Sequence, residues 1–256
     1  VATVPVAVDE GGMQVSALRC AGATIAYVTP SHQFPSGVSM PIGRRSELLG
    51  WVAEDPLRYI IEDDYDSEFR FDGRPIPSLQ GLGGGQVIYL GTFTKSIAPS
   101  IRIAYMVLPR TLLVRYHEMF GSYSSTVSRF EQHTLAQFIA EGHFARYLNR
   151  ARGAYRRRRD VLRCALTQEF GAGQVRFSGL HTGLYCTAQF TLGLAEAQLI
   201  TRAAEVGVQV TGLSRYYAHP EKAPASTLVL GYSSMDECEL CAAAKLLAAA
   251  WSTGLH

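Results

Sequence analysis

Four short apolar runs in the first half of the chain predict the strands of a buried sheet. They are the segments 23–29 (ATIAYVT), 59–62 (YIIE), 87–91 (VIYLG) and 103–108 (IAYMVL). Continuous apolar character, rather than strict alternation, is typical of parallel strands that are covered on both faces. A helical segment from Gly43 to Ala53 separates the first two runs. The pattern therefore predicts an α/β fold with a mostly parallel sheet.

The second half of the chain shows longer helical patterns and a different order of elements. Residues 128–169 read as helical, with one break near Glu141–His143. Strand candidates follow at 175–177, 184–190, 208–210 and 227–230, with helices at 194–206 and 235–251. This order predicts a smaller α+β domain. We expect a large domain over residues 1–145 and a small C-terminal domain over residues 146–256.

Composition and charge exclude several classes of protein. Hydrophobic residues make up 47% of the chain and charged residues 18%, which is typical of a folded chain. The net charge of +2 is too small to imply nucleic-acid binding, and consecutive arginines on a helix, as in Arg156–Arg159, form no single basic face. We expect that run to be solvated and partly salt-bridged. No apolar run approaches the roughly 20 residues that span a bilayer.

Cysteine usage indicates the compartment. The five cysteines are scattered and odd in number, which argues against a disulfide framework. Reduced thiols are typical of an intracellular setting, so we expect a cytoplasmic protein.

Three of the four apolar runs end in residues that can carry chemistry. The first is followed by Thr29–Phe34, the second ends in Glu62–Tyr65 and the third is followed by Thr92–Lys95. Parallel sheets bind ligands beyond the carboxyl ends of their strands. We therefore expect a site where these three segments meet.

Lys95 is the residue around which this site can be built. It stands between two apolar runs, so we expect it to be buried, with a lowered pKa that suits a Schiff base with a carbonyl. Thr92 and Arg102 offer a hydroxyl and a fixed positive charge suited to phosphate. An aldehyde that carries a phosphate is pyridoxal 5′-phosphate (PLP), whose ring nitrogen needs a carboxylate such as those of Glu62–Tyr65. The same carboxylates leave a metal site as the competing interpretation.

Three long motifs resemble the MocR branch of the GntR transcriptional regulators. They are Tyr27–Gly37 (YVTPSHQFPSG), Ile60–Gln80 (IIEDDYDSEFRFDGRPIPSLQ) and Tyr89–Ser96 (YLGTFTKS). Such regulators join a winged helix-turn-helix to a PLP-binding domain of the fold type I aminotransferase kind. The resemblance implies a truncated aminotransferase-like large domain followed by the small domain.

The resemblance also implies roles for single residues. Lys95 would hold PLP as a Schiff base, Asp63 would pair with the pyridine nitrogen and Tyr65 would bond the ring hydroxyl, while Thr92 and Arg102 would hold the phosphate. Asp64 is the alternative to Asp63.

In the small domain, Arg215 would bind the carboxylate of a substrate or effector. A plain surface arginine is the alternative interpretation of this residue.

The chain departs from ordinary aminotransferases at Phe34. Such enzymes have an Asn-Pro-x-Gly motif whose Asn bonds the ring oxygen of the cofactor, and Phe34 stands in its place. The regulators share this loss. The helix-turn-helix and the first part of the cofactor domain would precede Val1, so we expect this chain alone to bind PLP weakly or not at all.

The leading hypothesis is therefore an effector-sensing domain of a transcriptional regulator. Its partners would be a small amino compound and a second copy of the intact protein, with DNA bound only through the absent N-terminal domain. The alternative is a PLP-dependent aminotransferase that acts on an amino acid, with Lys95 as its catalytic base. Phe34 favours the sensor, so we lean against an enzyme.

Overall fold

The computed structural model describes residues 2–83 and 85–252, which form two compact units. The first unit contains residues 38–151 and those up to 33. The second contains residues 34–37 and those from 152 onward. The chain therefore passes between the units at both ends of the short segment 34–37, and once more within the long helix near residue 151.

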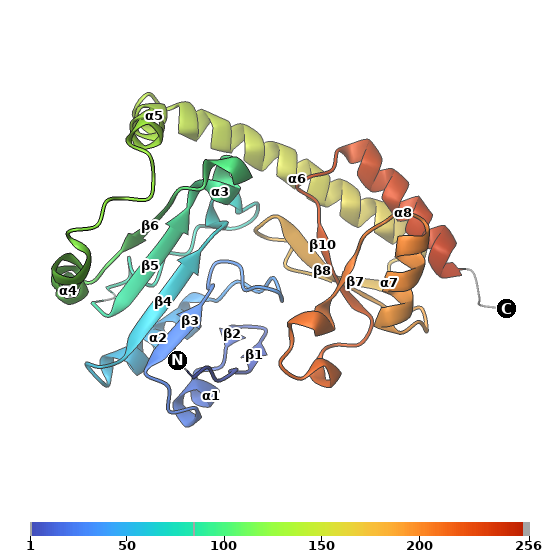
Figure 1. The fold of residues 1–256 in the computed structure, drawn as a ribbon. Coiled ribbons are helices and arrows are strands. Elements are labelled where there is room, and N and C mark those ends of the chain that lie inside the picture. Colours follow the sequence, from blue (N-terminus) through green and yellow to red (C-terminus); the bar gives the residue numbers. More distant parts are fainter. Residues whose placement is uncertain (1, 84, 253–256) are drawn as a thin grey trace. The chain divides into compact units, whose positions relative to one another are not determined.

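The first unit is built on a four-stranded sheet in the order β3-β4-β5-β6 (Figure 1). Its strands are β3 (Ile25–Val28), β4 (Tyr59–Asp64), β5 (Val87–Thr92) and β6 (Ala104–Val107). The first three run parallel, and β6 pairs antiparallel with β5. The helix α2 (Ile42–Ala53) connects β3 to β4. All four predicted strands and the mostly parallel sheet are confirmed.

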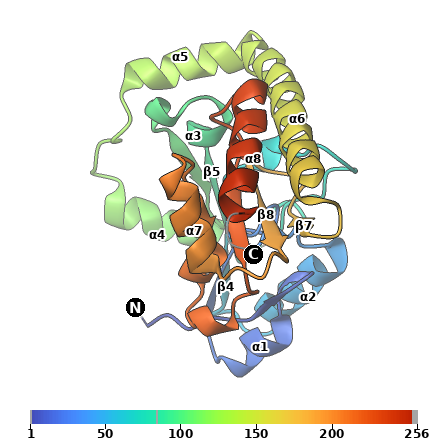
Figure 2. The same ribbon diagram turned by 90° about the vertical axis from the view of Figure 1, so that its right-hand side faces the viewer.

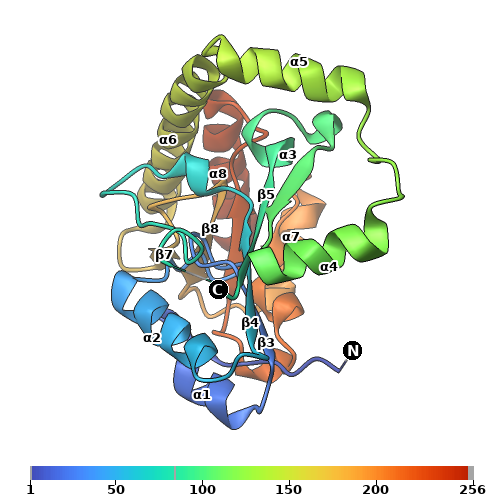
Figure 3. The same cartoon turned by 90° about the vertical axis from the view of Figure 1, so that its left-hand side faces the viewer.

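Two helices cover one face of this sheet. Helices α1 (Val15–Cys20) and α2 lie on the same side of it (Figure 3). Their apolar side chains form one core with every second strand residue; its members include Leu18, Leu48, Trp51, Val28, Ile60 and Val87. The opposite face is open along β3, where Ile25 is 53% and Tyr27 55% exposed. Strands covered on both faces were expected, and for β3 that expectation is wrong in this chain.

A buried ion pair joins helix α2 to strand β4 of the sheet. Arg45 on α2 is 1% exposed and Glu62 on β4 is fully buried, with 3.8 Å between Nη1 and Oε1. Burial raises the pKa of Glu62 and lowers that of Arg45, because each charge loses its hydration. The two opposite charges reduce this cost only because further hydrogen bonds satisfy both groups.

Those further hydrogen bonds hold two loops. Arg45 donates to the carbonyls of Pro30 and Pro77 at 3.0 and 2.9 Å, and to that of Met40 at 3.1 Å. The Glu62 carboxylate accepts from the backbone N–H groups of residues 79 and 80 at 2.9 and 3.0 Å. The pair therefore anchors the loop that follows β3 and the loop that precedes β5.

The remaining elements of the first unit are short or exposed. They are β1 (Val8–Asp9), β2 (Gly12–Met13), η1 (Ser67–Phe69), α3 (Phe93–Ser96), η2 (Pro99–Ile101), α4 (Arg110–Phe120), α5 (Arg129–Ala140) and the first part of α6 (His143–Phe170). The predicted break at Glu141–His143 is confirmed, with Gly142 at a φ of 72° between α5 and α6. Helix α4 has no buried residue. The sequence patterns did not predict α1, α3 or α4.

The second unit is a four-stranded antiparallel sheet with helices. The strand order is β7-β8-β10-β9, with β7 (Val175–Ser178), β8 (Tyr185–Phe190), β9 (Thr211–Gly212) and β10 (Thr227–Gly231). Helices α7 (Glu196–Glu205) and α8 (Glu237–Ser252) lie side by side (Figure 2). Trp251 packs on Phe190 at 4.8 Å between ring centroids and donates to the carbonyl of Leu199. The α+β prediction is confirmed, but the strand expected at 208–210 begins only at Thr211.

The arginine run of α6 is more buried than expected. Arg157 pairs with Glu237 at 3.3 Å, as a solvated helix would allow. Arg159, however, is only 6% exposed and donates to the carbonyl of Leu180 at 2.7 Å. The run is thus partly salt-bridged but not solvated throughout. Among the described residues, every helix is too short or too polar to span a membrane.

The Arg45–Glu62 pair predicts a large loss of stability when it is broken. Arg45→Ala leaves Glu62 charged and buried without its partner, so we expect the free energy of unfolding to fall by about 3–5 kcal/mol. Arg44→Ala on the same helix removes a partly exposed pair with Asp9 and should cost about 1 kcal/mol. Chemical denaturation of both variants measures the difference. Equal losses would contradict the role given to the buried pair.

Candidate functional site

The carboxyl ends of β4 and β5 bring most of the predicted site residues into one region. Strand β5 ends at Thr92, whose hydroxyl accepts a hydrogen bond from the N–H of Thr94 at 3.1 Å and so starts α3. Lys95 lies on this short helix and is exposed. The expectation of a buried Lys95 is wrong, because the strand ends three residues earlier and α3 carries the side chain out of the sheet.

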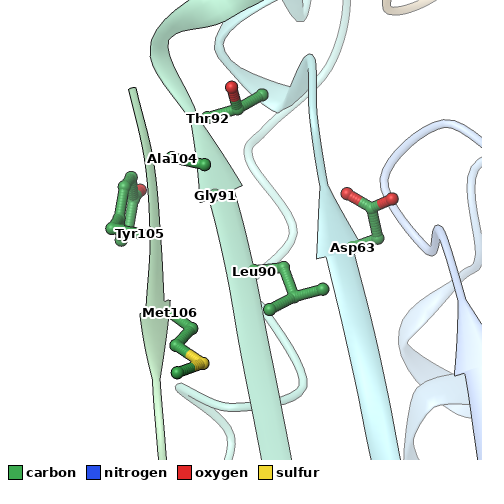
Figure 4. A pocket seen from close by; sticks show the side chains of 7 residues that line it. All are labelled: Asp63, Leu90, Gly91, Thr92, Ala104, Tyr105 and Met106. Atoms are coloured by element: carbon green, nitrogen blue, oxygen red, sulfur yellow. The ribbon is translucent and has the colours of Figure 1, made fainter. Parts of the chain in front are cut away.

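A pocket of about 400 Å³ opens where β4, β5 and β6 lie side by side (Figure 4). Its lining is mostly apolar and comprises Asp63, Leu90, Gly91, Thr92, Ala104, Tyr105 and Met106. Leu90, Met106 and Asp63 extend from one side of their strands, and the ring of Tyr105 extends from the other (Figure 4). The volume falls within the range of small-molecule sites, which combine apolar walls with a few polar groups.

Alternation along β4 separates the two adjacent aspartates. Asp63 lines the pocket and accepts a hydrogen bond from the hydroxyl of Tyr27 on β3. Asp64 lies on the other face, is 7% exposed and accepts from Ser67 and Tyr89 at 2.7 Å each. Burial and the hydrogen bond to Asp64 raise the pKa of Tyr89, so it remains a neutral donor. The carboxylate that faces the pocket is therefore that of Asp63.

Tyr65 follows these aspartates and faces the loop after β3. Its hydroxyl donates to the carbonyl of His32 at 2.7 Å. His32 is 1% exposed, and its Nδ1 lies 2.8 Å from Oδ2 of Asp66, which is 2% exposed. Burial raises the pKa of Asp66, against the opposing effects of His32 and of the positive charge of Lys95. Tyr65 and the His32–Asp66 pair therefore join the segment after β4 to the loop after β3.

Arg102 lies beside the turn that carries Thr92. The carbonyl of Ile103 accepts from the N–H of Phe93 at 2.9 Å and from the hydroxyl of Thr92 at 3.3 Å, so residues 102–103 adjoin the end of β5. Arg102 is exposed and has the left-handed conformation, with a φ of 49°. Arginine adopts this conformation at a cost of order 1–3 kcal/mol, and such outliers cluster at functional sites.

Gly91 is required by the close approach of Tyr105. The two residues are paired across β5 and β6, and a Cβ at Gly91 would lie 2.3 Å from Cζ of Tyr105. The aromatic ring therefore occupies the space that a side chain would need on the face opposite Asp63.

Arg215 lies in the second unit, apart from the other predicted residues in the chain. It is exposed on η3 (Leu213–Tyr216), which the Glu196 carboxylate holds by accepting from the N–H and the hydroxyl of Ser214. Phe34 also belongs to this unit and packs edge-on against Tyr185 and Tyr216, at 5.5 and 4.8 Å between ring centroids.

The competing metal interpretation has no structural support. Among the described residues, no group of three or more His, Cys, Asp or Glu side chains is arranged to hold a metal ion. The carboxylates of residues 62–64 alternate between the two faces of β4, so they do not converge on one point.

Sequence reasoning missed three residues of this region: Tyr27, His32 and Asp66. Tyr27 reaches Asp63 only because β3 and β4 pair with Tyr27 beside Ile61, and strand register cannot be read from a single sequence. His32 and Asp66 lie within quoted motifs, but nothing in the sequence indicates that they pair.

No protein-family model matches the chain, but curated proteins do. It is 43% identical over 249 residues to the uncharacterized HTH-type transcriptional regulator YdeL of Bacillus subtilis (strain 168), covering 97% of this chain and 53% of the relative. It is 36% identical over 234 residues to the probable rhizopine catabolism regulatory protein MocR of Rhizobium meliloti, covering 91% of this chain and 47% of that relative. The chain thus spans about half the length of these relatives.

Solved structures of aminotransferases share the fold. The kynurenine aminotransferase of Pyrococcus horikoshii, solved in complex with PMP, has a TM-score of 0.84 at 27% identity, covering 99% of this chain and 64% of the enzyme. The α-aminoadipate aminotransferase LysN of Thermus thermophilus, complexed with N-(5′-phosphopyridoxyl)-L-leucine, has a TM-score of 0.81 at 28% identity, covering 96% and 64%.

The contact between Gly91 and Tyr105 predicts opposite outcomes for two glycine substitutions. Gly91→Ala forces the ring of Tyr105 to move, so we expect a loss of about 1–3 kcal/mol in the free energy of unfolding. Gly50→Ala on α2 places its methyl group in open space and should stabilise the chain by about 0.5–1 kcal/mol. Chemical denaturation tests both variants, and adding Tyr105→Leu to Gly91→Ala should recover part of the loss. A Gly91→Ala variant as stable as the parent would contradict this packing.

Proposed function

This chain belongs, as a fold type I aminotransferase-like domain, to the MocR-type branch of the GntR transcriptional regulators, and on that premise we propose that it senses a small amino compound through bound PLP. The observation that carries the proposal is that Asp63 and Thr92 line one pocket at the carboxyl ends of β4 and β5, and that the helix of Lys95 begins directly after Thr92. Relatives of known structure hold PMP or a phosphopyridoxyl compound, which supports the choice of cofactor.

The residues of the pocket fit this cofactor. Its apolar walls suit a flat aromatic ring, and Asp63 presents a carboxylate to it, whereas Asp64 is held on the other face by Ser67 and Tyr89. This supports Asp63 over Asp64 as the partner of the pyridine nitrogen. When bound, PLP would supply an aldehyde and an electron sink.

Each proposed residue has a separate task. Lys95 would attach the cofactor as a Schiff base, and its side chain is exposed on α3, three residues after Thr92 of the pocket lining. Arg102 and Thr92 would hold the phosphate, since Arg102 stands beside the turn in which the Thr92 hydroxyl already fixes the backbone. Tyr65 would bond the ring hydroxyl, and because its own proton is donated to the His32 carbonyl, it is set to accept from that group.

Phe34 supports sensing rather than turnover. Its ring offers no hydrogen bond to a cofactor oxygen and packs instead on Tyr185 and Tyr216 in the second unit. A site that lacks this contact would still bind the cofactor, but with one interaction fewer to tune its chemistry. Aminotransferase activity is therefore the second candidate function.

The remaining partners are part of the same proposal. Arg215, exposed on η3, would bind the carboxylate of the amino compound. The whole protein would act as a homodimer in the bacterial cytoplasm, with DNA contacted outside this chain. The exposed apolar side chains of α4, such as Val114 and Met119, support a dimer because monomers rarely leave such helices uncovered.

Lys95→Ala should abolish the Schiff-base absorbance of the complete protein mixed with PLP. The chain offers matched controls, because its other two lysines, Lys222 and Lys245, are also exposed. Substituting either one should leave the absorbance unchanged. An undiminished signal in Lys95→Ala would rule out Lys95 as the attachment point.

Sensing and turnover are separated by a kinetic measurement. The complete protein with PLP, an amino acid and an excess of a keto acid should show a spectral change on adding the amino acid, but no sustained formation of new keto acid. Multiple turnovers per protein molecule would instead favour the aminotransferase.

A further inference from the structure

Tyr27 stands out on the open face of the sheet in the first unit. It lies on β3, is 55% exposed, and its hydroxyl donates to Oδ2 of Asp63. Among the described residues, Tyr27 is the hydrogen-bond partner that the structure gives Asp63. An exposed tyrosine contributes little to the core, so its role should lie in its hydroxyl rather than in its packing.

Strand register explains why this contact forms. In the parallel pairing of β3 with β4, Tyr27 lies beside Ile61, and Asp63 is the next residue of β4 on the same face. The long phenol side chain leans along the strand and reaches the carboxylate. A shorter side chain at this position would not span the distance between the two strands.

The hydroxyl of Tyr27 is suited to hold a carboxylate without neutralising it. Burial around the hydroxyl and the hydrogen bond to Asp63 raise the pKa of Tyr27 to about 12, so it remains a neutral donor at physiological pH. An arginine or lysine in its place would pair with the charge of Asp63 and compete with a cationic ligand. A neutral donor fixes one oxygen, and the carboxylate keeps its full negative charge for a cationic ligand at the other oxygen.

We propose that Tyr27 is a positioning residue that orients Asp63, so that the free carboxylate oxygen of Asp63 meets a protonated ring nitrogen in the pocket. This rests on the proposed function, because it takes the pyridine nitrogen of PLP as the group that Asp63 binds. Tyr27 does not touch the cofactor in this account and acts only through Asp63.

The test compares PLP with its 1-deaza analogue, which carries carbon in place of the ring nitrogen. In the complete protein, Tyr27→Phe should bind PLP about 10-fold more weakly, a loss typical of removing a residue that orients a ligand. Binding of the analogue should change little, because it has no ring nitrogen for Asp63 to meet. A merely structural role of Tyr27 would weaken both compounds equally. The matched control is Tyr59→Phe. Tyr59 lies on β4, on the same face as Asp63, and its substitution should alter neither affinity.

Asp63→Asn separates this inference from the proposed function. If Asp63→Asn lowers the preference for PLP over the analogue and Tyr27→Phe does not, Tyr27 has no positioning role while the proposed function stands. If Asp63→Asn leaves the preference unchanged, Asp63 does not bind the ring nitrogen, and the inference fails together with the role proposed for Asp63. Loss of preference in both variants supports the inference.

Discussion

The buried pair of Arg45 and Glu62 is the constraint on which the candidate site depends. A charged strand residue and a charged helix residue are both removed from water, and only their pairing and five hydrogen bonds make this tolerable. These bonds fix Pro30, at the start of the loop after β3, and Pro77, in the loop before β5. Asp63 directly follows Glu62 on β4. The residue that anchors the loops and the residue that faces the pocket are therefore neighbours on one strand.

Alternation along β4 places the three consecutive carboxylates of residues 62–64 on two faces of the sheet, where they have different roles. Glu62 and Asp64 point to the helix-covered face, where Arg45, Ser67 and Tyr89 bind them, while Asp63 points to the open face and the pocket. This division explains how three consecutive carboxylates can stand on one strand without converging on a metal site. It also leaves a single carboxylate available to a ligand, with Tyr27 as its donor.

Much of this arrangement could be predicted from the sequence. The apolar runs gave the four strands, and the polar residues at their ends indicated where the site lies. The role of Arg45 was also accessible, because residues 45, 48 and 52 share the buried face of α2 and a buried arginine requires a partner. The exposure of Lys95 could not be predicted, because apolar flanking residues do not reveal that β5 ends at Thr92 and that a turn of helix follows. The contact of Tyr27 with Asp63 depends on the register between β3 and β4. That register is set by the pairing of the two strands, and neither segment alone encodes it.

The central claim is that Lys95 carries PLP in the pocket beside Asp63. Reduction of the PLP-loaded complete protein with borohydride would fix the cofactor to the amine that holds it, and mass spectrometry of the peptides would locate the added mass. The account predicts the pyridoxyl group on the peptide that contains Lys95. Its appearance on the peptides of Lys222 or Lys245, or on none, would contradict the account.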